Sequence, residues 1–271
     1  MVKGLYTAYT GMINQMNRMD TLTNNLANSA TNGFKKEGCT SQAFDEVLAV
    51  KIKDTSDYSI PRALGGISLG VKIGETYTDY SQGPFRVTDN QNDMALDGDG
   101  FFAISFTNKA GVSSIKYTRD GAFTLTREGY LVTKDGDFVL NKEAALASNN
   151  QIVNGVPVGA IRLDPMQEYK VEEQGFIYQN DQLITQLGVV DVADYNFIRH
   201  YGENMYDLQE GGVIVDSNAR VRQDTLEMSN VNVVYEMVDM ITVTRAYETN
   251  QKVIQTIDDT LQKAVNSVGQ L

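Results

Sequence analysis

The sequence predicts an α+β protein in which coiled-coil helices at the two ends of the chain flank a mostly antiparallel β domain. Three observations predict this class: apolar residues at helical spacing in both ends, apolar residues at alternate positions in the middle, and recurrent turn signals between them. We expect residues 1–35 and 228–271 to form one discontinuous helical domain, residues 36–69 a linker or extension, and residues 70–227 the β domain.

The N-terminal segment predicts a helix over about residues 3–28. Its apolar positions alternate in steps of four and three, the spacing of a seam that packs against other helices. The seam consists of Leu5, Tyr9, Met12, Met16, Met19, Thr23 and Leu26. Gly33 follows the pattern and can close the helix or the turn after it.

The C-terminal segment predicts a second, longer helix over about residues 231–268. One apolar column recurs every seventh residue at Val233, Met240, Tyr247, Ile254, Leu261 and Val268. Met237 flanks this column early and Ile257 flanks it late, so the apolar face shifts around the helix near Gln251. A one-sided helix of this length needs a partner to cover it. We therefore expect both seams to pack with each other and with copies of this chain.

The middle of the chain changes to a period of two. Phe101–Phe106 reads FFAISF, and Asp120-Gly121, Glu128-Gly129 and Asp135-Gly136 are turn signals between short strands. Further strand-like stretches occur near residues 177–178, 183–192 and 213–215. Within the extension, residues 43–53 are compatible with one or two helical turns, and residues 54–66 with an exposed loop.

Composition excludes several classes of function. The net charge of −12 and the pI near 4.6 argue against nucleic acid as a partner, because phosphates require a basic face. One Cys and one His rule out a disulfide within the chain and the common zinc ligand sets. No stretch reaches the length of a transmembrane helix, and the N-terminus lacks the apolar core of a cleaved signal peptide.

Charge is distributed unevenly along the chain. Residues 1–35 carry a net +2 from Lys3, Arg18, Asp20 and Lys35, whereas residues 228–271 carry a net −2 and the middle carries the remaining −12. The ends are therefore nearly neutral and weakly complementary, and the β domain is the solvated part.

Candidate catalytic and metal sites fail on their chemistry. We expect His200 at the surface, Cys39 as an unreactive thiol, and residues 97–100 as a turn, because they lack the carboxylate spacing of a calcium loop. We predict no catalytic residues, cofactor or metal.

A polar run follows the first helix. It contains Asn24, Asn25, Leu26, Ala27, Asn28, Thr31, Gly33, Phe34 and Lys35. Its Asn and Thr side chains can bond the helix end and the turn beyond it. The run resembles the N-terminal signature of the flagellar axial proteins, which include rod, hook and hook-associated proteins. Asn32 stands where many members carry Pro.

Two further stretches carry the same resemblance. Ser229, Asn230, Val231 and the later Arg245-Ala246-Tyr247-Glu248 resemble the C-terminal helix of the family, with Ser229 or Asn230 as the helix cap. Residues 82–102 and 117–123 resemble the β framework of rod and hook proteins. Three matching signatures in the same order form a specific signal, although residues 141–227 match loosely.

The resemblance implies a structural subunit of the flagellar basal-body rod, of the FlgF or FlgG type, in its proximal or distal part. It implies self-assembly with other rod and hook subunits, export through the flagellar type III apparatus without a cleaved signal peptide, and a role in motility. Alternatives are a hook-type subunit, a soluble coiled-coil adaptor, a secreted binding module, or a carbohydrate-active β domain.

Overall fold

The computed structural model describes residues 2–50, 63–108, 111–147, 152–153, 155–202 and 204–268. The chain forms two compact units. One, the helical unit, comprises Met1–Ala27, Lys36–Asp79 and Val231–Leu271, and the other, the β unit, comprises Asn28–Lys35 and Tyr80–Asn230. This division differs from the expected one, since residues 28–35 belong to the β unit and residues 36–79 to the helical unit.

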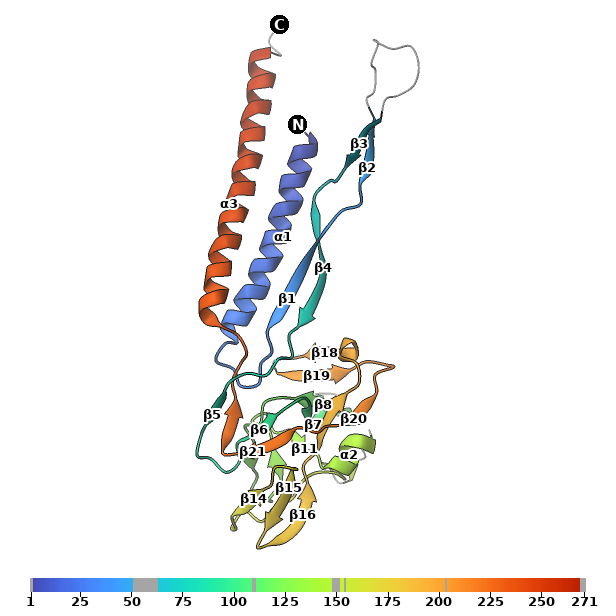
Figure 1. The fold of residues 1–271 in the computed structure, drawn as a ribbon, viewed down its shortest axis with the longest axis vertical. Helices are drawn as coiled ribbons and strands as arrows, with labels where there is room; N and C mark the ends of the chain where they lie inside the picture. The colour runs from blue at the N-terminus through green and yellow to red at the C-terminus, as the bar shows by residue number, and fades with distance from the viewer. Residues whose placement is uncertain are drawn as a thin grey trace. The chain divides into compact units, whose positions relative to one another are not determined.

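Two helices lie side by side in the helical unit: α1 (Val2–Ala27) and α3 (Val233–Lys263), which continues into the π-helical turn Ala264–Val268 (Figure 1). Both predicted helices are therefore present. The predicted N-cap of α3, Ser229 or Asn230, was wrong. The cap is Asn232, whose side-chain oxygen accepts hydrogen bonds from the N–H groups of Val234 and Tyr235. Asn230 instead donates its side-chain N–H to the carbonyl oxygen of Ser81.

The two helices run antiparallel, and glycines mark their contact on α1. A β-carbon built on Gly11 would lie 3.1 Å from Nδ2 of Asn250, and one built on Gly4 would lie 3.8 Å from Cδ1 of Ile257. These contacts are seven residues apart on each helix and progress in opposite directions. The packing uses glycine positions because no side chain there holds the helices apart. The glycines at this contact are not among the residues of the predicted seam.

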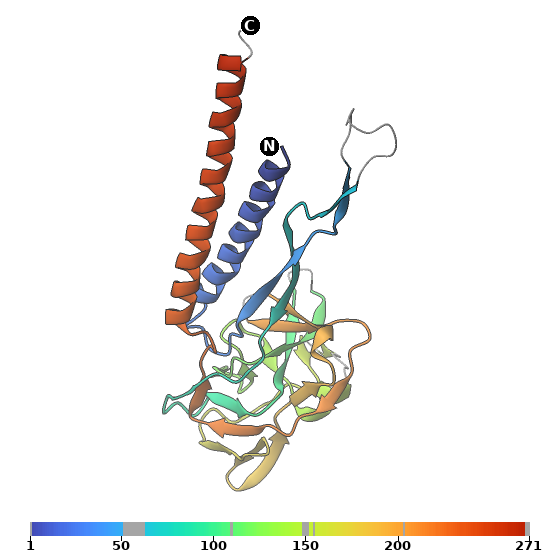
Figure 2. The same cartoon turned by 45° about the horizontal axis from the view of Figure 1, so that its top comes forward.

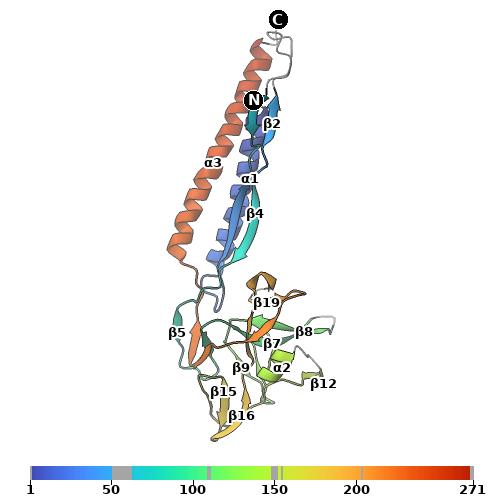
Figure 3. The same ribbon diagram turned by 45° about the vertical axis from the view of Figure 1, so that its right-hand side comes forward.

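A two-stranded antiparallel ribbon completes the helical unit. It is formed by β1 (Glu37–Ala43) with β4 (Val71–Thr78), and by β2 (Val47–Val50) with β3 (Ala63–Ile67), as Figures 2 and 3 show. Asn14 of α1 donates its side-chain N–H to Oγ of Ser41, 2.9 Å away. Thus α1 is covered on one side by α3 and on another by the base of the ribbon.

The expected helical turns within residues 43–53 are wrong where the structure describes them, because Val47–Val50 pairs as a strand with residues 63–67. A strand partner overrides weak helical propensity in so short a run. The loop expected over residues 54–66 is wrong for residues 63–66, which lie in β3. Residues 54–62 lie outside the described part of the chain.

The β unit is built on one large sheet whose described pairings are antiparallel. Its order is β18-β19-β8-β7-β11-β10-β9, with β17 beside β7 and β20 beside β17. The strands are β7 (Phe101–Thr107), β8 (Ser113–Thr118), β9 (Thr124–Leu125), β10 (Leu131–Val132), β11 (Phe138–Val139), β17 (Val189–Val192), β18 (Ile198–Tyr201), β19 (Met205–Leu208) and β20 (Ile214–Asp216).

Smaller antiparallel groups surround this sheet. They are β5 (Phe85–Val87) with β22 (Thr225–Glu227), β6 (Met94–Asp97) with β21 (Arg220–Gln223), β12 (Ile152–Val153) with β13 (Val156–Pro157), and the sheet of β14 (Tyr169–Val171), β15 (Phe176–Gln179) and β16 (Gln182–Gln186). A short helix, α2 (Lys142–Ala147), and a 3₁₀ turn at Tyr195–Phe197 complete the unit.

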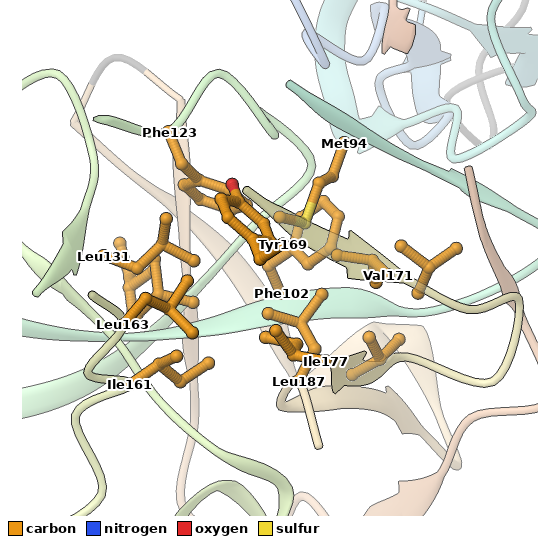
Figure 4. Packing of buried hydrophobic residues seen from close by; sticks show 14 of the residues in the cluster. Met94, Phe102, Phe123, Leu131, Ile161, Leu163, Tyr169, Val171, Ile177 and Leu187 are labelled. Carbon is orange, nitrogen blue, oxygen red and sulfur yellow. The ribbon is translucent and has the colours of Figure 1, made fainter. Parts of the chain in front are cut away.

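The core of the β unit lies on both faces of the large sheet. Phe102 and Ile104 of β7 enter one apolar cluster, part of which Figure 4 shows, whereas Phe101 and Ala103 enter a second. Successive side chains of a strand point to opposite faces, so β7 is buried on both sides. This double burial explains why the run FFAISF is almost continuously apolar rather than strictly alternating.

Candidate functional site

Residues within and next to the two predicted terminal signatures meet in two buried polar clusters, one in each unit. The Glu227 cluster, in the β unit, consists of Lys35, Arg119 and Glu227. The Glu236 cluster, in the helical unit, consists of Asn25, Lys36, Glu37 and Glu236. In each unit, residues about 200 positions apart are therefore joined by buried polar contacts.

The Glu227 carboxylate lies between two cations. Its Oε1 is 2.6 Å from Nζ of Lys35 and accepts the N–H of Gly83 at 2.9 Å, while its Oε2 accepts Nη1 of Arg119 at 3.1 Å. The side chains of Lys35 and Glu227 are 1% exposed and that of Arg119 is 3% exposed. No substrate can reach these groups, so their role is structural.

The excess positive charge of the cluster is solvated by backbone carbonyls. Nζ of Lys35 donates to the carbonyl oxygen of Ser81 at 2.8 Å, and Nη2 of Arg119 donates to that of Gly98 at 2.8 Å. A buried ion group of this kind contributes little net stability, but the loss of one partner leaves an uncompensated charge. The cluster therefore makes the placement of Lys35 strongly dependent on Glu227.

The residues before Lys35 are also built into the β unit. Gly33 donates its N–H to the carbonyl oxygen of Glu227 at 2.8 Å and has a φ of 67°, in the left-handed region. A β-carbon there would lie 2.5 Å from the carbonyl carbon of Arg119, which only glycine avoids. Phe34 is buried and meets the ring of His200 edge-on, with centroids 6.3 Å apart.

The surface prediction for His200 is wrong. Its side chain is half-buried and lies against two rings, those of Phe34 and Tyr206, because β18 pairs with β19 and places His200 opposite Tyr206. Cys39 is a free, half-buried thiol in β1. Asp97 ends β6 and residues 98–100 connect it to β7, with Gly98 and Gly100 at positive φ, in agreement with the predicted turn.

Asn25 joins the three parts of the helical unit. Its side-chain amide donates to the carbonyl oxygen of Glu37 at 2.8 Å and accepts the N–H of the same residue at 2.9 Å. The amide also donates to Oε2 of Glu236 at 3.3 Å. Asn25 and Glu236 are 0% exposed, so one buried amide connects α1, β1 and α3. We predicted that this asparagine bonds the turn after α1; it bonds Glu37 of β1 and Glu236 of α3 instead.

An ion pair completes the Glu236 cluster. Nζ of Lys36 lies 2.5 Å from Oε1 of Glu236, and this hydrogen bond to Glu236 raises the pKa of Lys36 above its usual 10.5. A lysine whose pKa is raised on folding contributes stability that is fully present below pH 10.5 and is lost as the pH rises through the raised value. The pair is therefore intact at neutral pH.

The predicted seam residues separate into two groups. Those that are exposed are Tyr9, Met16, Val233, Met237 and Leu261, and those that are half-buried are Leu5, Met12, Met19, Leu26, Met240, Tyr247 and Ile254. The remaining residues of the two predicted signatures are exposed at Asn24, Ala27 and Arg245, half-buried at Asn28, Thr31 and Asn230, and buried at Ser229. Each seam therefore has apolar side chains that its own chain leaves open to solvent.

Sequence reasoning missed the partners of the signatures. No sequence pattern indicated that Glu227 is part of a site, because a single carboxylate in a short strand does not predict an ion pair with a lysine 192 residues away. Arg119 and Glu236 lay within the recognised stretches, but were not assigned to ion pairs.

No metal or membrane function emerges from the described residues. Within them, no group of three or more His, Cys, Asp or Glu side chains could hold a metal ion. No helix in the same part of the chain is long and apolar enough to span a membrane.

Replacement of Glu227 by alanine tests the first cluster. The change leaves Lys35 and Arg119 buried without an anion, so we expect the free energy of unfolding of the β unit to fall by about 3–5 kcal/mol. Urea unfolding followed by the near-UV circular dichroism of the tyrosines measures it. Glu173→Ala is the control, because the pair of Glu173 with Arg220 is exposed and contributes at most about 1 kcal/mol. Equal losses in the two variants would contradict the role of the cluster.

Replacement of Asn25 by aspartate tests the second cluster. It removes both hydrogen bonds that the amide donates and places a carboxylate beside that of Glu236, so we expect a loss of about 2 kcal/mol or more in the helical unit. Thermal unfolding followed by far-UV circular dichroism at pH 7 measures the change. Gln251→Glu is the control, because it makes the same amide-to-carboxylate change at an exposed position of α3. If both variants melt with the wild-type chain, Asn25 does not hold the unit together.

Comparisons with known proteins agree with the two signatures. Three family models match: "Flagella basal body rod protein" at residues 5–35, "Flagellar hook protein FlgE/F/G D1 domain" at residues 95–179, and "Flagellar basal body rod FlgEFG protein C-terminal" at residues 222–267. The first includes Asn25, Phe34 and Lys35, and the last includes Glu227 and Glu236. The matches therefore cover all three residues of the Glu227 cluster, and Asn25 and Glu236 of the other cluster.

Individual relatives align over nearly the whole chain. The flagellar basal-body rod protein FlgG of Borreliella burgdorferi is 33% identical over 98% of this chain and 98% of its own length. FlgG of Buchnera aphidicola is 32% identical over 97% of this chain and 98% of its own length. The flagellar hook-basal body complex protein FlhO of Bacillus subtilis is 29% identical over the full length of both chains. These relatives are structural proteins and not enzymes. The chain therefore belongs to the flagellar basal-body rod protein family.

Proposed function

We propose that this chain is a structural subunit of the flagellar basal-body rod that assembles through α1 and α3 with copies of itself and with other rod and hook subunits. The observation that carries this proposal is the apolar surface that remains on both helices after they have packed against each other. Contiguous exposed apolar surface of this kind marks an interaction site in a soluble protein.

The exposed side chains suit packing between many subunits. Tyr9 and Met16 of α1 and Val233, Met237 and Leu261 of α3 are exposed. Methionine adapts to irregular gaps, which favours contacts that differ slightly from one neighbour to the next. Contacts that are not self-complementary produce an open helical assembly when the rotation between copies does not close a ring, as a tubular rod requires.

The β unit has the complementary role of an outer layer. The expected excess of negative charge lies in the middle of the chain, and the large sheet has a core on each face, so this unit does not depend on the helices for its core. We infer that it limits the deformation of the rod and gives its outer surface.

The proposal includes the location of the chain in the cell and its route of export. The relatives are named as basal-body rod proteins and as a hook-basal body complex protein, which supports a place in the basal body of the flagellum. Export through the flagellar type III apparatus, without a cleaved signal peptide, and a role in motility belong to the same proposal. A hook subunit is the second candidate, because the model for residues 95–179 names a hook protein. The end-to-end alignment with FlgG favours the rod.

Removal of the C-terminal helix tests assembly. In a strain whose own copy of the gene is deleted, we expect the full chain to restore swimming and a chain that ends at Asn230 to fail, because the exposed face of α3 is absent. The amount of chain in isolated basal bodies, measured by immunoblot, separates failed assembly from failed movement.

A full-length variant controls for damage to the fold. Met237→Ala trims an exposed seam residue of α3 without removing the helix, so its fold is retained, and we expect reduced but detectable incorporation. If cells that produce the truncated chain swim at the wild-type rate, assembly through α3 is refuted.

A further inference from the structure

The first part of α3 carries an apolar face that points away from α1. Glu236 faces α1, because it accepts a hydrogen bond from the side chain of Asn25. Val234 and Val238 precede and follow Glu236 by two residues, which places them about 200° around a helix of 3.6 residues per turn. They are 65% and 52% exposed, and Ile241, one turn further along the same side, is 53% exposed. These three residues form the α3 face.

The outward side of α1 carries a second apolar face. A β-carbon on Gly11 would lie 3.1 Å from the side chain of Asn250, so Gly11 marks the side of α1 that faces α3. Tyr9 and Ile13 precede and follow Gly11 by two residues and therefore lie on the opposite side, with Met16 one turn further. Tyr9 and Met16 are 50% and 46% exposed, and Ile13 is half-buried. Tyr9, Ile13 and Met16 form the α1 face.

The two faces lie on opposite sides of the pair of helices. When copies that point in the same direction stand side by side, the α3 face of one copy therefore meets the α1 face of the next. The two helices then meet antiparallel, as α1 and α3 do within the chain. The contact repeats from copy to copy without a change of orientation, as a rod of like-oriented subunits requires.

The apolar layers select a register for this contact. Both faces run in steps of three and four residues, so their side chains form three layers when the helices are antiparallel. The opposed pairs are Tyr9 with Ile241, Ile13 with Val238, and Met16 with Val234. In this register every residue of each face is covered by the other face.

The residues beyond the faces suit the same register. Lys3 comes level with Glu248, and both are exposed, so opposite charges meet at the rim of the contact. Tyr6, which is 58% exposed, comes level with the exposed Arg245, and a guanidinium group is attracted to the face of a tyrosine ring. Asp20 comes level with the start of α3, where the helix dipole favours a negative charge.

Shifts by one heptad lose these contacts. A shift of seven residues toward the end of α3 places Arg245 opposite Ile13, so a charge loses water beside an apolar side chain. A shift in the other direction places Ile13 and Met16 beyond the first residue of α3, Val233, and leaves them uncovered. The register that opposes Tyr9 to Ile241 is therefore favoured over both.

We propose that the α3 face of one copy packs antiparallel against the α1 face of the next like-oriented copy, with Tyr9 opposite Ile241. This inference rests on the proposed function and names the contact through which the helices assemble. Within one chain Tyr9 is level with Lys252 instead, because Gly11 contacts Asn250. Neighbouring copies are therefore offset along the helices by about ten residues, or ~15 Å at 1.5 Å per residue. An offset that adds at every contact produces a helical row rather than a flat ring.

Cysteine cross-linking tests the register. A full-length chain carries Cys39→Ser, Tyr9→Cys and Ile241→Cys, and basal bodies from the gene-deleted strain that produces it are isolated and oxidised. The two new cysteines lie on opposite sides of their own pair of helices, so they can bond only between copies. We expect a ladder of dimers, trimers and larger species on a non-reducing gel, because each copy bonds one neighbour through each cysteine.

Matched cysteine variants report other arrangements. Tyr9→Cys with Lys252→Cys reports neighbouring copies without an offset, and Tyr9→Cys with Val234→Cys reports a shift by one heptad. Chains with only one of the new cysteines should remain monomeric on the gel. A ladder from either alternative pair in place of the pair with Ile241→Cys would overturn the proposal. Incorporated chains with Tyr9→Cys and Ile241→Cys that form no ladder would overturn it as well.

An added charge tests the same contact without cysteines. Val238→Asp places a carboxylate opposite Ile13 of the next copy, so we expect the amount of chain in basal bodies, measured by immunoblot, to fall about tenfold or more. Thr256→Asp is the control, because it adds the same charge five turns further along the same side of α3. In the proposed register that position lies beyond the N-terminal end of the neighbouring α1, and we expect wild-type incorporation.

These outcomes separate the contact from the proposed function. Val238 and Thr256 are exposed, so circular dichroism of both aspartate variants should match that of the wild-type chain. Equal incorporation of the two variants would overturn the contact, since only Val238 lies in it. If the wild-type chain is incorporated in that case, the proposed function stands and the contact alone fails. If the wild-type chain is absent from basal bodies, the proposed function fails.

Discussion

The carboxylate of Glu227 is the group that joins the first and last segments of the β unit, residues 28–35 and β22. It is buried, and it is compensated by Lys35 from the segment that follows α1 and by Arg119 from the β unit. Glu227 itself ends β22, shortly before α3 begins. Because an unpaired buried charge costs several kcal/mol, the incoming and outgoing segments are held beside the same atom group.

The adjacent residues Lys35 and Lys36 form ion pairs in different units. Lys35 binds Glu227 within the β unit, whereas Lys36 binds Glu236 within the helical unit, where Asn25 also contacts that carboxylate. Two adjacent residues therefore each form an ion pair with a buried carboxylate, one in each unit. Helices held in this way keep the same outward apolar faces from copy to copy, which is what repeated assembly requires under the proposed function.

Periodicity predicted the two helices because each carries many apolar residues at regular spacing. Periodicity did not predict which apolar column of a helix packs against the other helix of the same chain. Hydrophobicity does not distinguish a face that packs within the chain from one that packs against a neighbouring chain. The internal contact runs through Gly4 and Gly11, which have no apolar side chain to give a signal. The buried ions were equally hidden, since Glu227 and Lys35 are far apart in sequence and each resembles an ordinary surface charge. The cap at Asn232 depended on which of two nearby asparagines the β unit had already engaged.

A double-mutant cycle between Lys35 and Glu227 tests the central claim most directly. The free energy of unfolding is measured for the wild-type chain, Lys35→Met, Glu227→Gln and the double variant. The account predicts that the two effects are coupled by about 1–3 kcal/mol, because each change removes the partner of the other. Effects that add within about 0.5 kcal/mol would contradict it, since Glu227 would then not hold the N-terminal segment through Lys35.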